Sequence, residues 1–179
     1  MRQWQLPPPP PVIPARRSIF VSYHHAVDQW YYNEFSRLFS DAYGVLQDHS
    51  LTRLFDSDDA DYVIRRIRER YVSGSSCTVV LCGPMTRWRK YVDWEIKATL
   101  DMEHGLIGVN LPHNPTDPQG RVHKPDRLQD NIDSGYALWI QWSRLTQGPA
   151  AFRVWVELAI ASEAHLVRNT RPLRVRNGP

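Results

Sequence analysis

Apolar and polar residues follow two different periods along the chain. Nearly continuous apolar runs occur at residues 18–23, 77–82, 105–111 and 136–142, and short runs of this kind are typical of strands buried in a parallel sheet. Between them, apolar residues recur every three or four positions, as on the buried face of a helix. The pattern therefore predicts strands that alternate with helices.

The helical spacing predicts four helices. They are expected around residues 31–39, 63–72, 87–103 and 150–166. A further short strand is expected at residues 51–55, and a proline-containing loop at residues 112–125. Strand and helix alternate about five times, so we expect an α/β fold in the form of a three-layer sandwich with a mostly parallel, five-stranded sheet.

The two ends of the chain differ in composition from the part between them. Residues 1–16 contain the run PPPPP, which favours polyproline II and predicts a flexible arm. Residues 17–167 carry the strand and helix pattern and are expected to form one domain. Residues 168–179 contain four arginines and no acid, and we interpret them as a basic C-terminal tail.

Charge narrows the choice of partner. The formal net charge is +3 among 179 residues, but seven of the 22 basic residues lie in the two ends, and residues 18–167 carry more acids than bases. A nucleic-acid binder needs a basic face for the phosphate backbone. We therefore do not expect nucleic acid as a partner, unless the ends alone bind it.

Membrane and secretion signals are also absent from the sequence pattern. No stretch approaches the roughly 20 apolar residues of a membrane span, and the prolines near the N-terminus do not suit a signal peptide. Cys77 and Cys82 have neither a disulfide framework nor a metal-ligand spacing around them. We expect a cytoplasmic protein that has no membrane partner.

Candidate ligand-binding residues should follow the strands, because ligands of open parallel sheets bind at the carboxyl ends of the strands. The chain has no P-loop, no GxGxxG and no GxSxG motif there. His24, His25 and Asp28 invite a metal hypothesis, but adjacent side chains diverge and no third imidazole or thiolate is suitably spaced. We expect no metal site.

Two segments of the sequence resemble a known family. SIFVSYHHAVDQ at the first strand and TVVLCGPMTRWRKYVDWEI at the third are similar to the TIR-like family of the MTH538 type. Its best-known members are the B components of the bacterial Thoeris antiphage system. The resemblance spans about residues 17 to 166 and implies a flavodoxin-like, TIR-like fold.

The resemblance also implies an activity. TIR enzymes of this kind take NAD⁺ as a substrate, without any further cofactor, and break the bond between nicotinamide and ribose. Thoeris members close the product into a cyclic ADP-ribose isomer, which a downstream effector senses. Glu95 of DWEI matches the catalytic glutamate. The expected substrate-binding residues are Ser22, Tyr23, His24, His25, Asp56, Ser57, Cys82, Gly83 and Trp94.

One glutamate suffices for this chemistry. Glycosidases need a second carboxyl group to protonate the leaving oxygen, whereas nicotinamide leaves from a pyridinium as a neutral molecule. A single carboxylate then stabilises the developing cation. The alternative is a non-catalytic TIR-like adaptor that signals through self-association or partner binding, because some TIR domains are scaffolds only.

Overall fold

The sheet is the centre of the molecule. The computed structural model describes residues 16–47 and 60–178. These residues contain five strands: β1 (Ser18–Ser22), β2 (Gly44–Gln47), β3 (Cys77–Cys82), β4 (Gly105–Asn110) and β5 (Leu138–Gln141). All neighbours pair in parallel, in the order β2-β1-β3-β4-β5. This confirms the predicted α/β fold, and the strand order is that of flavodoxin-like sheets.

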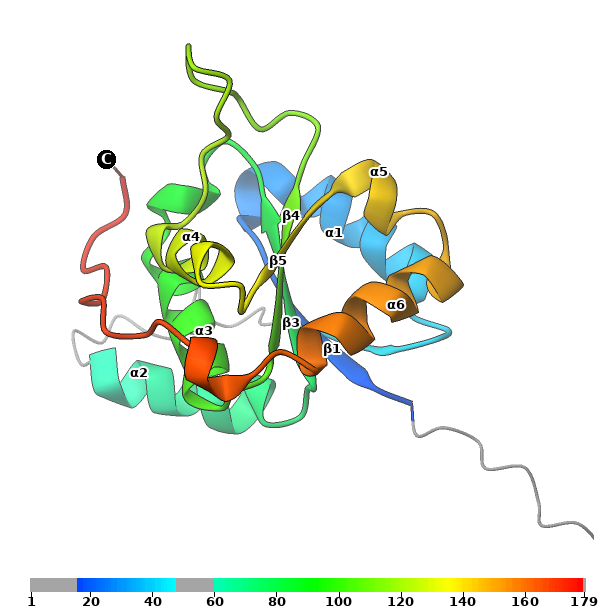
Figure 1. Cartoon of the computed structure of the whole chain (residues 1–179), viewed down its shortest axis with the longest axis horizontal. Helices are drawn as coiled ribbons and strands as arrows, with labels where there is room; N and C mark the ends of the chain where they lie inside the picture. The colour runs from blue at the N-terminus through cyan, green and yellow to red at the C-terminus, as the bar shows by residue number, and fades with distance from the viewer. Residues whose placement is uncertain (1–15, 48–59, 179) are drawn as a thin grey trace, which may run out of the picture.

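Helices cover both faces of the sheet. They are α1 (His25–Phe39), α2 (Ala60–Ile67), α3 (Lys90–Asp101), α4 (Asp126–Asp133), α5 (Trp142–Leu145) and α6 (Pro149–Ile160). In Figure 1, α1, α5 and α6 lie on one side of the sheet, and α2, α3 and α4 lie on the other. The fold is therefore the three-layer sandwich that the alternating pattern predicts.

The central strands bury side chains on both faces. Ile19 and Val21 of β1 pack in the cluster that contains Phe35 of α1 and Phe152 of α6. Phe20, which lies between them, faces the opposite cluster with α2 and α3. Successive side chains of a strand point to opposite faces, so a strand that is buried on both faces reads as an uninterrupted apolar run. This is why β1 and β3 were the easiest strands to predict.

Several elements differ from the expectation. The second strand that the structure describes is β2 at Gly44–Gln47, whereas the strand expected at residues 51–55 lies outside the described residues. Helix α3 begins at Lys90, after a 3-10 turn at Thr86–Trp88. Helix α6 ends at Ile160, before the expected end at residue 166.

Helix α4 was not predicted at all. Its sequence DRLQDNID is polar, with buried side chains only at Arg127, Leu128 and Asn131. Two of these three are polar residues, so the apolar period that marks a helix is missing. Contacts with distant residues, rather than local pattern, stabilise it.

The end of the chain lies against the α2–α3–α4 side of the sheet. We call residues 167–178 the C-terminal strap. It follows α3 and α4 and is drawn in red in Figure 1. The expected proline-rich arm, by contrast, falls almost entirely on residues outside the described part. Within the described ranges, no helix has the length and apolar character that crossing a membrane requires.

Candidate active site

A pocket opens where β1 ends, beside β3. The sheet order reverses direction between these two strands, and ligands of such sheets bind at this switch point, outside the carboxyl ends of the strands. The pocket is lined by Tyr23, His24, His25, Arg89, Tyr91, Val92, Glu95 and Asn177. The first three residues lead from β1 into α1, and the next four lie at the start of α3.

Glu95 is the carboxylate of this pocket. It follows Tyr91 by four residues and Val92 by three, so the three side chains share one face of α3. Glu95 is only 6% exposed, and the buried hydroxyl of Ser22 donates a hydrogen bond to its Oε2. A buried carboxylate requires such donors. The last residue of β1 therefore positions the expected catalytic group.

Tyr23 forms an ordered aromatic wall. Its ring stacks on Tyr32 at a centroid distance of 4.8 Å and lies 4.3 Å from the ring of His25. Its hydroxyl donates to Oε1 of Gln29 at 2.9 Å. Burial raises the pKa of the Tyr23 hydroxyl well above its usual value. The ring is therefore fixed and neutral, and it forms part of the wall of the pocket.

His24 and Arg89, which both line the pocket, differ in charge. Burial, together with nearby Arg89 and His25, lowers the pKa of His24 to about 4, so His24 is neutral at physiological pH. Arg89 retains its charge, because the guanidinium cannot lose its proton in a protein. Its Nε is buried without a hydrogen-bond partner among the described residues, and a buried donor of this kind is normally satisfied. Arg89 therefore brings a guanidinium to the lining of the pocket, with one buried donor that the described residues leave unpaired.

The pocket is small. Its volume is about 120 Å³, below the roughly 300 to 1,000 Å³ of typical ligand cavities. It has room for one ring of a ligand, and the remainder of a larger molecule must lie across the surface outside it.

Four of the expected substrate-binding residues gather around Glu95, and three others do not. Ser22, Tyr23, His24 and His25 are in place as described. The Cys82 thiol is buried among apolar side chains, and burial raises its pKa. Gly83 lies against the Asp28 carboxylate, where a Cβ would be 2.2 Å from Oδ1.

Trp94 is the third residue placed elsewhere. It packs in the cluster formed with α2, and its indole nitrogen donates to the carbonyl of Arg174 at 2.9 Å. Asp56 and Ser57 lie outside the described residues.

Four lining residues were not among the expected site residues: Arg89, Tyr91, Val92 and Asn177. Tyr91 could have been found, because it precedes Glu95 by one helical turn. Asn177 gave no signal, since nothing in the sequence connects it with residues so distant along the chain.

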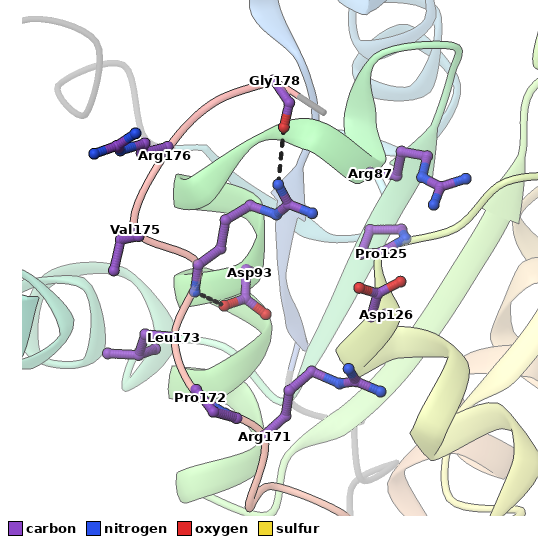
Figure 2. Close-up of a pocket in the computed structure, with 11 residues that line it drawn as sticks. Arg87, Asp93, Pro125, Asp126, Arg171, Pro172, Leu173, Val175, Arg176 and Gly178 are labelled. Atoms are coloured by element: carbon purple, nitrogen blue, oxygen red, sulfur yellow. Dashed lines mark hydrogen bonds between the residues drawn. The ribbon is translucent and has the colours of Figure 1, made fainter.

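A larger hollow nearby has a different character. It has a volume of about 400 Å³ and lies between the strap and the start of α4, as Figure 2 shows. Its carboxylates are Asp93 and Asp126, and Asp93 is paired with Arg127. Glu95 does not line it. Among the described residues, no group of three or more His, Cys, Asp or Glu side chains is arranged to hold a metal ion.

Together, the parallel sheet in flavodoxin-like order and the buried glutamate on the helix after the third strand define a TIR-like domain. The model of the family described as Thoeris protein ThsB, TIR-like domain, matches residues 20–116. This is more than half of the chain, which therefore belongs to that family. Membership indicates a TIR-type signalling role.

The matched range contains Ser22 to His25 and Glu95 but ends long before Asn177. Among solved structures, the chain is similar to the TIR domains in the structure of the activated Roq1 resistosome directly recognizing the pathogen effector XopQ. The two share 12% identity and a TM-score of 0.40 over 80% of this chain and 81% of the other. No curated protein sequence matches this chain.

Proposed function

We propose that this protein binds NAD⁺ at the Glu95 pocket, breaks the nicotinamide–ribose bond and closes the remainder into a cyclic ADP-ribose isomer, a second messenger in Thoeris-type antiphage defence. The observation that carries the proposal is the buried carboxylate of Glu95, held by Ser22 beside a fixed aromatic wall. Family membership supplies the reaction class.

The bond that breaks joins C1′ of the ribose to the pyridinium nitrogen. The bonding electron pair leaves with nicotinamide, which becomes neutral, so the site needs no proton donor for the leaving group. Positive charge develops on the ribose, and an anionic oxygen of Glu95 stabilises it. His24 is neutral at physiological pH, so it adds no further positive charge next to this carboxylate.

The second step decides the product. A nucleophilic atom at the adenosine end attacks C1′ and gives a cyclic isomer, whereas attack by water gives ADP-ribose. Cyclisation therefore requires a folded ligand and exclusion of water. The small pocket holds one ring and leaves the adenosine end outside, where it can fold back over the ribose.

The state of the two cysteines is consistent with a bacterial cytoplasm. Cys77 and Cys82 are free thiols in the core, as is usual in a reducing compartment. We place the enzyme there, with a downstream effector that senses its product.

The test compares the wild type with Glu95→Gln, which keeps the shape and the acceptor for Ser22 but removes the charge. Cells that express each protein are challenged with phage, and their small molecules are separated and weighed by mass spectrometry. We expect a species with the mass of cyclic ADP-ribose in the wild type only, and a loss of at least about 100-fold in Glu95→Gln, as for removal of a group that stabilises transition-state charge.

The matched control is Glu69→Gln, on an exposed turn after α2, which should leave the product unchanged. Equal product from wild type and Glu95→Gln, or none from either, would overturn the proposal.

An adaptor role is the second candidate. Trp30 of α1 is 63% exposed, and Val27 one turn earlier is also exposed. A large aromatic side chain in contact with solvent is characteristic of interface anchors. This surface suits a second copy of the chain, and self-association would then carry the signal.

A further inference from the structure

The C-terminal strap runs antiparallel to the helix that carries Glu95. Near its start, Asn169 donates to the carbonyl of Lys97 and to Asp101, at the end of α3. Near its finish, the backbone N–H of Gly178 donates to the carbonyl of Trp88, just before α3 begins. The strap therefore follows the whole length of α3 (Figure 1), and its Asn177 lines the pocket that contains Glu95.

A buried ion pair anchors the middle of the strap. Arg127 of α4 is fully buried and bonds Asp93 of α3 through Nε at 2.9 Å. The same guanidinium donates to the carbonyls of Arg171 and Pro172 at 2.9 and 3.2 Å. Asp93 in turn accepts the backbone N–H of Arg174 at 2.9 Å, which Figure 2 marks. One carboxylate and one guanidinium thus join α3, α4 and the strap.

The last residues of the strap are held by a second set of bonds. The Arg174 side chain donates to the carbonyl of Gly178 at 3.0 Å, also marked in Figure 2. Its guanidinium lies over the Trp88 ring at 5.4 Å. Asn177 lies between Arg174 and Gly178 in the chain. Its Oδ1 accepts a hydrogen bond at 3.0 Å from the backbone N–H of Lys90, which is the first residue of α3. The side chain of Asn177 is therefore fixed at the mouth of the pocket that contains Glu95.

From this geometry we infer that Asn177 binds the substrate. Its Oδ1 is already used by Lys90, so the group that it offers to a ligand is the Nδ2 amide, which only donates hydrogen bonds. It can donate to an oxygen acceptor next to the ring in the pocket, and the carboxamide carbonyl and the ribose hydroxyls of NAD⁺ are acceptors of this kind. The identity of the ligand as NAD⁺ rests on the proposed function.

The position of Asn177 implies a role in substrate binding and not in the bond-breaking step. Asn177 lies at the mouth, whereas Glu95 lies at the buried end of the pocket. Asn177 contributes to holding the ligand before and after the bond breaks, and such uniform binding affects KM rather than kcat.

Two variants of Asn177 distinguish a binding role from a structural one. Asn177→Asp keeps an oxygen that accepts the Lys90 N–H but has no amide donor, and Asn177→Ala has neither. Both are made in the Glu95→Gln protein, so that NAD⁺ is not consumed, and binding of NAD⁺ is measured by titration calorimetry. We expect both to raise the dissociation constant about tenfold, the effect of one hydrogen bond to a ligand.

The controls test the strap itself. Val175→Ala alters an exposed side chain of the strap and should leave NAD⁺ binding unchanged. In the otherwise wild-type protein, the two Asn177 variants should raise KM about tenfold and leave kcat within about twofold. Thermal unfolding of Asn177→Asp should match that of the parent.

Each remaining outcome overturns the inference. If only Asn177→Ala weakens binding, the residue caps α3 and does not contact the ligand. If neither variant weakens binding while the wild type consumes NAD⁺, the inference fails and the proposed function stands. If NAD⁺ does not bind the wild type at all, both fail together.

Discussion

The pocket shows how single side chains are prepared by their neighbours. Glu95 has Ser22 as a donor, and Tyr23 has Gln29 as an acceptor. His24 has lost the usual basicity of its imidazole through burial and through the nearby charge of Arg89. As a result, the pocket combines the Glu95 carboxyl group and the Arg89 guanidinium with a neutral His24 and the fixed ring of Tyr23.

The altered basicity of His24 makes a prediction about pH. Its pKa is about 4 in the folded protein and about 6.5 in the unfolded chain. The folded state therefore binds fewer protons between these values, and the contribution of His24 to stability is fully present above pH 6.5 and is lost progressively as the pH falls towards 4.

We expect the His24 imidazole signals in an NMR titration to change near pH 4, with His24→Gln used to assign them. We also expect the rate of nicotinamide release to depend on pH in the same way in the wild type and in His24→Gln around pH 6.5, because His24 does not titrate there. An imidazole that titrates near pH 6.5 would contradict the environment described here.

Among the elements, α3 has the largest share of functional contacts. Its first turns supply Tyr91, Val92 and Glu95 to the pocket and Asp93 to the ion pair with Arg127. One face of α3 therefore lines the pocket, and another face forms the ion pair that joins α3 to α4. Any change that loosens Asp93 should also disturb Glu95, which lies two residues further on.

The Arg127–Asp93 pair predicts a stability difference. Removal of one partner of a buried ion pair leaves an uncompensated charge and costs about 3 to 5 kcal/mol. Arg127→Ala should lower the free energy of unfolding by this amount in urea denaturation. Arg121→Ala, which removes the exposed pair with Asp117, should have a much smaller effect, because solvent-exposed ion pairs contribute little to stability. Equal effects would mean that the buried pair does not anchor α3 and α4.

Local pattern explains which elements could be predicted from the sequence. The bounds of β3 were predicted correctly, because every side chain of CTVVLC is buried. A run of this kind can be recognised from the local sequence alone. α4 and the strap were missed as packed elements, because Arg127, Asn131 and Asp93 stabilise them through contacts with residues 34 to 81 positions away. In the site, the family resemblance singled out Ser22 to His25 and Glu95, which the structure brings together around one pocket, whereas the place of Asn177 depends wholly on tertiary structure.

At the scale of the whole molecule, two surfaces stand out: the pocket that contains Glu95 and the exposed apolar side chains of α1. The pocket opens at the end of the sheet where β1 finishes, and α1 leads away from it with Trp30 and Val27 exposed. Self-association through α1 would place two pockets near the same interface. In that arrangement, assembly and catalysis would be linked.

Sedimentation velocity tests this arrangement. We expect the wild type to sediment as a species larger than the 20.9 kDa chain at high concentration, and Trp30→Ala to weaken association by about 2 kcal/mol, as for an interface anchor. Val154→Ala, an exposed apolar side chain on α6, is the matched control. A wild type that stays monomeric at every concentration would exclude the adaptor role.

The position of Asn177 in the chain has a consequence for synthesis. β1, β3 and α3 are made first, and the sheet edge with Glu95 can form while translation continues. The pocket, however, gains its last wall only when residue 178 has left the ribosome and the strap has bonded to Trp88 and Lys90. A nascent or prematurely terminated chain would therefore contain Glu95 without the Asn177 side chain at the mouth of its pocket.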